Sequence, residues 1–205
     1  SKFTLVLLLI VSIPAIAIIF FFYGRAYDMV VSYTIRQEQD RSAETAPLIE
    51  ESIQKVLDVS EEISSLDFYQ TLFKNAITDS FTDLADSPDA ASFSQKVDQL
   101  ITGTPVTNVK IYMEVPKDSP SDINALLNKE DLKDTFLSLD QVRGTYWYGI
   151  FRGSRVSQLF CPSFYLGTKE QKAYGDQAYI THASVIYNNG TYDAYMAVYY
   201  SSHDF

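Results

Sequence analysis

The chain opens with an unbroken run of apolar residues. Residues 3–23 read FTLVLLLIVSIPAIAIIFFFY and contain no charged side chain. At a rise of about 1.5 Å per residue, a helix of this length reaches the thickness of the hydrocarbon core of a bilayer. Pro14 is tolerated in membrane helices, and the aromatic residues at 20–23 fall where an interfacial belt would lie. The pattern predicts a transmembrane helix within residues 1–24.

A cleaved signal peptide is the alternative interpretation of this run. Ala15-Ile16-Ala17 has the small-residue spacing of a cleavage site, but it lies inside the apolar run, and cleavage sites normally follow such a run. We therefore expect an uncleaved anchor in the cell membrane. Lys2 and Arg25 balance each other across the span, and the long acidic remainder favours a cytoplasmic N-terminus with the rest of the chain outside the cell.

Residues 25–84 carry the periodicity of an extracytoplasmic helical segment. Apolar side chains recur there at steps of three and four residues, which places them on one face of a helix. These positions are Leu48, Ile49, Ile53, Val56, Leu57, Ser60 and Ile63. Acidic residues lie off this stripe, so we expect the helix to pack on its own domain or on a second copy of the chain.

The pattern changes after residue 85. Ser87-Pro88 is a helix start, with serine as the N-cap and proline at the first helical position, and Gly103 with Pro105 marks the end of that helix. Residues 109–115 then alternate between apolar and polar side chains, which predicts a strand. Residues 116–140 are polar with short helical patches at 124–128 and 131–139, and we expect them to cover one face of a sheet.

Two β-rich runs near the end are joined by Asn189-Gly190, a strong hairpin signal. A two-residue turn at this pair places Tyr187 opposite Tyr192, and Ile180 opposite Tyr199. Alternation along the strands divides the side chains between two faces. One face holds Tyr179, Thr181, Ala183, Val185, Tyr192, Ala194, Met196 and Val198, and the other holds Ile180, His182, Ser184, Tyr195, Ala197 and Tyr199. Neither face is fully polar, so we expect one to pack on a helix and the other to line a cavity.

Composition narrows the possible functions. The chain has 16 basic and 26 acidic residues, a net charge of −10, which disfavours nucleic acid as a partner. The single cysteine, Cys161, excludes an internal disulfide and a site of several thiolates. The sequence contains no G-x-S-x-G motif and no metal-binding histidine spacing, so we expect neither a catalytic site nor a metal or other cofactor.

The order of membrane helix, long helix and sheet with helical cover resembles the Cache family, which comprises PAS-like extracytoplasmic sensors. The detailed similarity is to the N-terminal region of YesM-like bacterial sensor histidine kinases. It rests on LVLLLIVSIPAIAIIFFFYGRAY, on NVKIYMEVP and on the stretch from TYWYGIF to the final hairpin. The resemblance implies an α+β fold with a PAS-like antiparallel sheet over residues 85–205, and it implies a homodimer.

The resemblance also implies where a ligand would bind. Amino-acid-sensing members hold the ligand with an R-x-W-Y element and a later aspartate. Trp147-Tyr148 matches the W-Y pair and Tyr165 a further aromatic, whereas Thr145 occupies the arginine position and Tyr199 the aspartate position. We expect an aromatic pocket without recognition of a free α-amino acid. The full set of expected ligand contacts is Trp147, Tyr148, Tyr165, Tyr112, Arg143, His182, Tyr195 and Tyr199, with Arg152 and Arg155 as further groups that could bind a carboxylate.

Together these observations predict the ligand-sensing part of a membrane-bound sensor histidine kinase. It would bind a small molecule or a solute-binding protein, and the kinase core would lie beyond this chain, which we expect to be a piece of a longer protein. Two alternatives remain. The same module could serve a chemotaxis receptor or a cyclic-dinucleotide enzyme, or the chain could be a membrane-anchored assembly protein whose long helix is an oligomerisation arm.

Overall fold

The computed structural model describes residues 46, 48–77, 80–115, 120–187 and 190–201. Its contacts divide the chain into two units, Ser1–Ile49 and Glu50–Phe205. The transmembrane helix predicted within residues 1–24 lies outside the described residues. Within the described part of the chain, no helix combines the length and the apolar character that crossing a membrane requires. The architecture below is that of the second unit, whose limit does not coincide with the boundary predicted between residues 84 and 85.

The helix predicted over residues 25–84 is shorter at its C-terminal end than expected. The described part is helical over 48–65 and stops at Leu66, whose backbone is extended. A second helix, α2 (Asp67–Phe73), follows, and then a short strand, β1 (Ala76–Ile77), and α3 (Phe81–Ala85). Serine side chains explain the breaks, because Ser64 and Ser65 donate to backbone carbonyls of the preceding turn and Ser80 caps α3.

The apolar stripe of the first helix is buried only in its second half. Val56 and Ile63 are fully buried and Ser60 nearly so, whereas Leu48 is 58% exposed. The next helix, α4 (Pro88–Ile101), confirms the predicted cap, since the Ser87 hydroxyl accepts a hydrogen bond from the backbone of Ala90. Gly103 follows it with φ 78°, the left-handed conformation expected after a helix.

The sheet has six strands and is mixed, which corrects the antiparallel sheet expected from the sequence. The long strands β2 (Val106–Met113), β5 (Gln177–Tyr187) and β6 (Gly190–Tyr200) are antiparallel, with β6 between the other two. β4 (Gln158–Cys161) pairs antiparallel with the outer edge of β5, and β1 pairs parallel with the same strand. On the far edge β3 (Phe136–Ser138) runs parallel to β2.

The strand β3 replaces the helical patch predicted at 131–139. Turns occupy 130–135, and the Ile111 amide donates to the Thr135 carbonyl at 2.8 Å, which draws the following residues into the sheet. Before these turns lies α5 (Pro120–Leu127), and after β3 comes a short 3-10 helix, η1 (Leu139–Gln141). β3 is only three residues long, too short for an alternation of apolar and polar side chains to be recognised in the sequence.

The hairpin forms, but its register differs by two residues from the prediction. Tyr187 pairs with Gly190 and Ile180 with Ala197, so the residues between the paired ends are 188 and 189, which lie outside the described part. A Cβ atom on Gly190 would lie 2.7 Å from the Tyr192 hydroxyl, a contact that a movement of that side chain would relieve. A shift of two preserves the side-chain faces, and the predicted division between the faces is confirmed.

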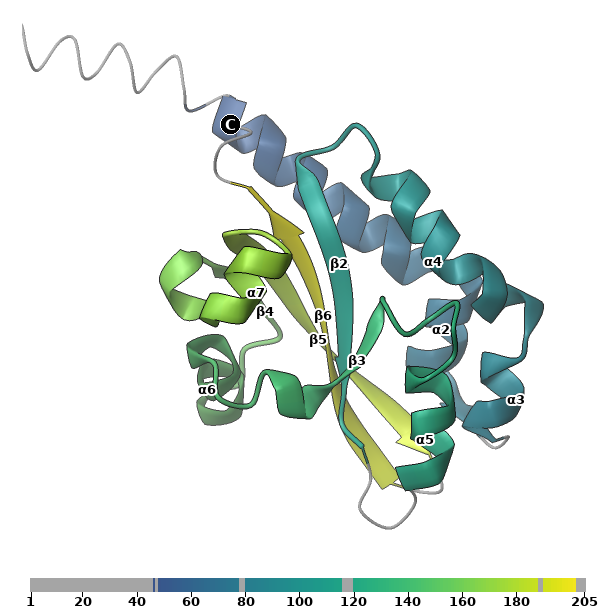
Figure 1. The fold of residues 1–205 in the computed structure, drawn as a ribbon. Coiled ribbons are helices and arrows are strands. Elements are labelled where there is room, and N and C mark those ends of the chain that lie inside the picture. The colour runs from purple at the N-terminus through teal and green to yellow at the C-terminus, as the bar shows by residue number, and fades with distance from the viewer. Residues whose placement is uncertain (1–45, 47, 78–79, 116–119, 188–189, 202–205) are drawn as a thin grey trace, which may run out of the picture. The chain divides into compact units, whose positions relative to one another are not determined.

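The sheet lies between two unlike layers (Figure 1). One face packs against α2, α3, α4, α5 and the helix that ends at residue 65, through a core that includes Phe68, Phe93 and Met196. The other face is covered by two short helices, α6 (Tyr146–Gly153) and α7 (Thr168–Ala173), joined by β4 and by a 3-10 turn, η2 (Ser163–Tyr165). This arrangement confirms an α+β fold in which both faces are covered.

Candidate ligand-binding cleft

The helix α6 brings the aromatic residues of the Y-W-Y segment onto the sheet. The Thr145 hydroxyl caps it by accepting a hydrogen bond from the Tyr148 amide. Trp147 and Phe151 are four residues apart and therefore share a face, which packs on Tyr195 of β6 with ring centroids 5.6 and 5.1 Å away. Trp147 has no exposed surface. The segment therefore forms the core of this layer.

A buried carboxylate holds the two covering helices and the sheet together. Glu170, in the first turn of α7, is only 6% exposed. Its Oε1 accepts from the Tyr199 hydroxyl at 2.5 Å and from the Trp147 indole at 3.2 Å, and its Oε2 accepts from the Gly167 amide at 2.8 Å. The two carboxylate oxygens have enough lone pairs to accept all three hydrogen bonds. One acidic side chain thus connects α6, α7 and β6.

The hydroxyl of Tyr112 extends this network along the sheet. Its oxygen lies 2.8 Å from that of Tyr199, and because Tyr199 donates to Glu170, Tyr112 donates to Tyr199. Burial raises the pKa of both phenols well above the ordinary value. Both side chains therefore stay neutral and hold their hydrogen bonds throughout the physiological range. The polar atoms at this position already have partners within the fold.

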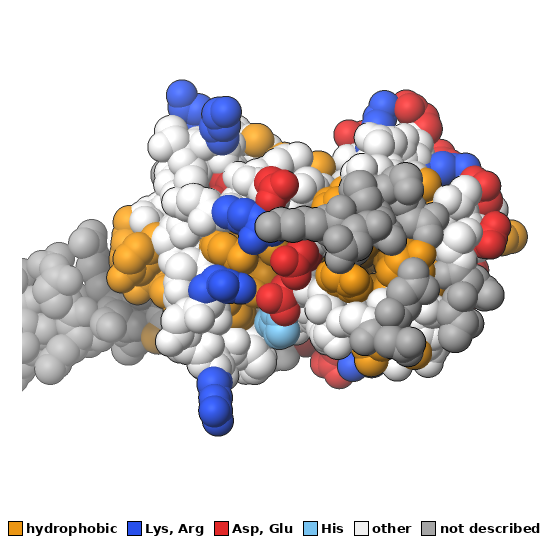
Figure 2. Space-filling view, turned by 90° about the horizontal axis from the view of Figure 1, so that it is seen from below, with side chains coloured by type: hydrophobic (Ala, Val, Ile, Leu, Met, Phe, Trp, Pro, Cys, Tyr) orange, Lys and Arg blue, Asp and Glu red, His pale blue; other side chains and the backbone are white. Residues whose placement is uncertain are grey.

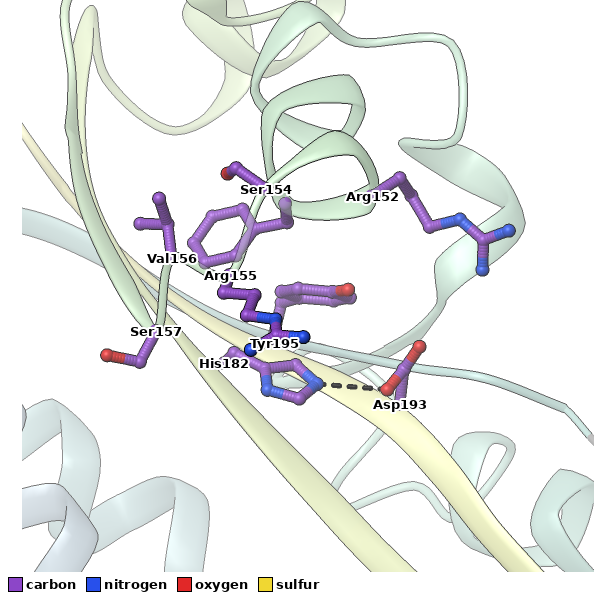
Figure 3. A pocket seen from close by; sticks show the side chains of 9 residues that line it. Arg152, Ser154, Arg155, Val156, Ser157, His182, Asp193 and Tyr195 are labelled. Carbon is purple, nitrogen blue, oxygen red and sulfur yellow. Dashed lines mark hydrogen bonds and ion pairs between the residues drawn. The ribbon is translucent and has the colours of Figure 1, made fainter.

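An open cleft lies at the C-terminal end of α6, beside this core. Its volume is about 360 Å³, and it is shown in Figure 3. Three parts of the fold line it: the end of α6 with the turn to β4, one position on β5 and two on β6. The lining residues are Phe151, Arg152, Ser154, Arg155, Val156, Ser157, His182, Asp193 and Tyr195. The Ser157 carbonyl accepts from the His182 amide at 2.8 Å, which fixes the turn on the sheet.

Charged side chains surround the cleft, and basic and acidic groups meet beside a histidine on this face (Figure 2). His182 Nε2 lies 2.9 Å from Asp193 Oδ1, and both side chains are about one-third exposed, at 35% and 36%. In Figure 3 the Arg155 side chain passes close to Tyr195 toward this pair, whereas Arg152 lies on the opposite side of Tyr195, above Asp193. Neither arginine forms an ion pair with any described residue.

The structure does not bring together in one place the eight side chains that the sequence suggested as ligand contacts. Five of them belong to one buried cluster, Tyr112, Trp147, Tyr148, Tyr195 and Tyr199. Tyr165 packs against the edge of that cluster and lies 4.8 Å from Tyr146, ring centroid to centroid. His182 and Tyr195 line the cleft.

Arg143 stands apart from the cleft in a set of polar contacts of its own. It donates to Asp140 at 2.5 Å and to the Tyr148 hydroxyl at 3.1 Å, and it lies 3.8 Å from Glu114. The first of these contacts raises the pKa of its guanidinium. Arg143 thus uses its hydrogen-bonding capacity within the protein, in contrast to Arg152 and Arg155.

Sequence reasoning missed two important residues. Asp193 lies on the same face of β6 as Tyr195, and the alternation of the strand was a sufficient signal for it. Glu170 stands three residues after Gly167, the spacing of an acidic residue that caps the start of a helix. Nothing in its neighbourhood in the sequence indicated burial, because charged side chains are rarely buried unless paired.

The cleft presents charged and polar groups beside an aromatic core. Among the described residues, no group of three or more histidine, cysteine or acidic side chains could hold a metal ion. Burial raises the pKa of the Cys161 thiol to about 12, so at neutral pH it is not the thiolate that nucleophilic chemistry requires. The cleft offers two guanidinium groups, an imidazole–carboxylate pair and the edge of an aromatic core.

Comparison with known proteins adds no relative: no protein-family model matches the chain, and searches of curated proteins and of solved structures returned no significant match.

Proposed function

We propose that this chain is the extracytoplasmic ligand-sensing part of a membrane-bound receptor, of the Cache type, from a sensor histidine kinase. A small solute binds in the cleft at the end of α6. In this proposal the chain itself carries no catalytic step, and the signal passes to a cytoplasmic output domain through the anchoring helix. The ligand must bind two arrangements of the protein with unequal affinity, since otherwise no signal is transmitted.

One observation carries the proposal: a cleft on the covered face of the sheet contains two arginines that have no ionic partner among the described residues. The layered arrangement supports it as well. The face opposite the cleft packs against the helix that ends at residue 65, and both layers share the strands β5 and β6. A shift of these strands on ligand binding would therefore reach that helix through direct packing.

A thermal-shift screen of the purified 205-residue chain in mild detergent tests this function. The solutes would include neutral sugars, amino acids, organic acids and amines, each at several concentrations. A receptor is stabilised by its ligand in proportion to RT ln(1 + [L]/Kd), so the melting temperature should rise with the logarithm of the concentration of at least one solute.

The assembly alternative predicts a different result from the same instrument. If the helix that ends at residue 65 were an oligomerisation arm, the melting temperature would rise with protein concentration and no solute would change it. That outcome would overturn the sensing proposal. Saturable stabilisation by one solute at constant protein concentration would support it.

A further inference from the structure

We infer that the ligand of this cleft is a small hydrophilic oxyanion, a carboxylate or a phosphate, bound by Arg155 and Arg152. This inference rests on the proposed function and names the chemical class of its ligand. It assigns recognition to the turn that follows α6 and not to the Trp147-Tyr148 pair, because Trp147 is fully buried and already donates to Glu170.

The balance of charge around the cleft supports an anion. The whole chain has a net charge of −10, yet this cleft contains two guanidinium groups and one carboxylate. That carboxylate, on Asp193, is already paired with His182 at 2.9 Å. The nearby Glu114 accepts a hydrogen bond from the Asp193 amide at 3.2 Å and lies 3.8 Å from Arg143. Among the charged side chains that line the cleft, the two guanidinium groups therefore outnumber the single carboxylate.

The chemistry of arginine specifies the type of anion. A guanidinium presents donors in a planar fork that matches two oxygens of a carboxylate or phosphate. Arg155 follows the last turn of α6 and extends toward Tyr195 and the His182–Asp193 pair, as Figure 3 shows. The two aromatic residues of the lining, Phe151 and Tyr195, are only 8% and 2% exposed, so they offer a ligand little apolar surface, and the ligand must be largely polar.

A purely structural role accounts for only one of the two arginines. Arg152 lies in the last turn of α6, where a positive charge interacts favourably with the helix dipole. Arg155 lies beyond the helix, is exposed, and has no ionic partner among the described residues. Pockets for small ligands usually measure about 300–1,000 Å³. At about 360 Å³, this cleft is of the size that suits a solute of a few carbon atoms.

The test compares probes that differ in charge but not in shape. Succinate and succinamide have the same carbon skeleton, and only the first is an anion; inorganic phosphate tests the second source of oxyanion. Binding to the 205-residue chain is measured by thermal shift and by titration of tryptophan fluorescence, with the ionic strength held constant by potassium chloride, since exposed charges are screened by salt. We expect saturable binding of succinate or phosphate and none of succinamide.

Variants then locate the site. Arg155→Gln should weaken binding of the anion roughly ten-fold or more, the usual effect of losing a charge-assisted hydrogen-bonded pair, and Arg152→Gln should weaken it less. Arg155→Lys retains the charge but not the planar fork of donors, so its affinity for the anion should lie between those of the parent chain and of Arg155→Gln. Lys96→Gln, in α4 on the opposite face of the sheet, changes the net charge equally and should have no effect. Far-UV circular dichroism verifies that each variant is folded.

The possible results distinguish a failure of the oxyanion inference from a failure of the sensing proposal. If a neutral or cationic solute from the wider screen binds, and its binding is unaffected by Arg155→Gln, the oxyanion inference is wrong and the sensing function stands. Equal effects of Arg155→Gln and Lys96→Gln on succinate or phosphate binding would indicate nonspecific charge and would also overturn the inference. If no solute of any class binds, both proposals fail.

Discussion

The buried carboxylate of Glu170 makes a sharp prediction about stability. In Glu170→Gln, an amide replaces the group that accepts from Tyr199, Trp147 and the Gly167 amide. An amide has one acceptor oxygen where the carboxylate has two. If that oxygen faces Tyr199, the NH₂ group meets the Gly167 N–H at about the 2.8 Å now spanned by a hydrogen bond. If the amide is reversed, the NH₂ group faces the Trp147 indole instead.

The first orientation leaves the Gly167 N–H without an acceptor, and the second leaves the Trp147 indole only a long 3.4 Å contact to the remaining oxygen. The loss of such a buried hydrogen bond costs about 1–3 kcal/mol. The remaining hydrogen bonds lose the contribution of the ionised acceptor, and they become roughly half as strong. The opposing effect is that a neutral amide is less costly to bury than a carboxylate. Because all the carboxylate's donors are already in place in the native fold, we expect the loss to dominate, with a net destabilisation of about 2 kcal/mol.

Urea unfolding at neutral pH measures this difference. The chain has one tryptophan, Trp147, whose burial makes its fluorescence a direct probe of the network. The midpoint should fall without a change in slope, and the melting temperature should drop by roughly 4–8 °C. Glu130→Gln is the matched control, because the Glu130 side chain is 82% exposed and forms an i,i+3 ion pair with Lys133 at the surface. Its effect should stay within about 0.5 kcal/mol. A Glu170→Gln chain as stable as the parent would refute the reasoning.

Three further predictions follow from burial and backbone geometry. Because burial raises the pKa of Cys161 to about 12, a thiol reagent at pH 8 should modify it only after denaturation; rapid modification of the native chain would contradict its burial. Gly175 has φ 152°, and a Cβ atom there would lie 2.9 Å from the backbone of Tyr200, so Gly175→Ala should lower the free energy of unfolding in urea by roughly 2–3 kcal/mol. As the control, Gly149→Ala, at an open position of α6, should raise the free energy of unfolding by about 0.5–1 kcal/mol. The pKa values of Tyr112 and Tyr199 are raised above 10 in the fold, so their contribution to stability is complete below pH 10 and declines as pH rises above it. The chain has 15 tyrosines, so the titration of these two is taken as the difference in absorbance at 295 nm between the parent and a variant with Tyr112→Phe and Tyr199→Phe. That difference should appear together with the loss of circular dichroism, and its appearance near pH 10 in the folded chain would argue against the buried network.

The sequence was most informative where one pattern recurs along a long element. Alternation in β2, β5 and β6 divided the side chains correctly between the two faces, and a register error of two residues did no harm because the side-chain period of a strand is two. The cap at Ser87 was equally clear, since proline and serine have few other roles at a helix start. These signals depend on neighbouring residues in the sequence, so they can be interpreted without knowledge of the tertiary fold.

The sequence was least informative where short elements depend on distant partners. β3 contains three residues and forms because the Ile111 amide binds the Thr135 carbonyl, a contact between segments more than twenty positions apart. The break at Leu66 has a local setting instead, because Ser65 donates to the carbonyl of Glu62 in the preceding turn, and the hydrophobic periodicity of a helix carries no signal for such a contact. The burial of Glu170 could not be predicted from the sequence, because its three hydrogen-bond donors come from three separate elements of the fold.

The relation between Trp147 and the cleft decides how a bound anion would be sensed. Trp147 lies behind Phe151 and Tyr195, 6.0 and 5.6 Å away between ring centroids, and both of these rings line the cleft. An anion held by Arg155 therefore touches the turn after α6 and not the tryptophan itself. If binding moves α6 against the sheet, the indole must change its surroundings, and its emission should shift as binding saturates. Saturable anion binding with unchanged emission would show that α6 stays in place, and the signal would then have to pass through His182 and the strand β5.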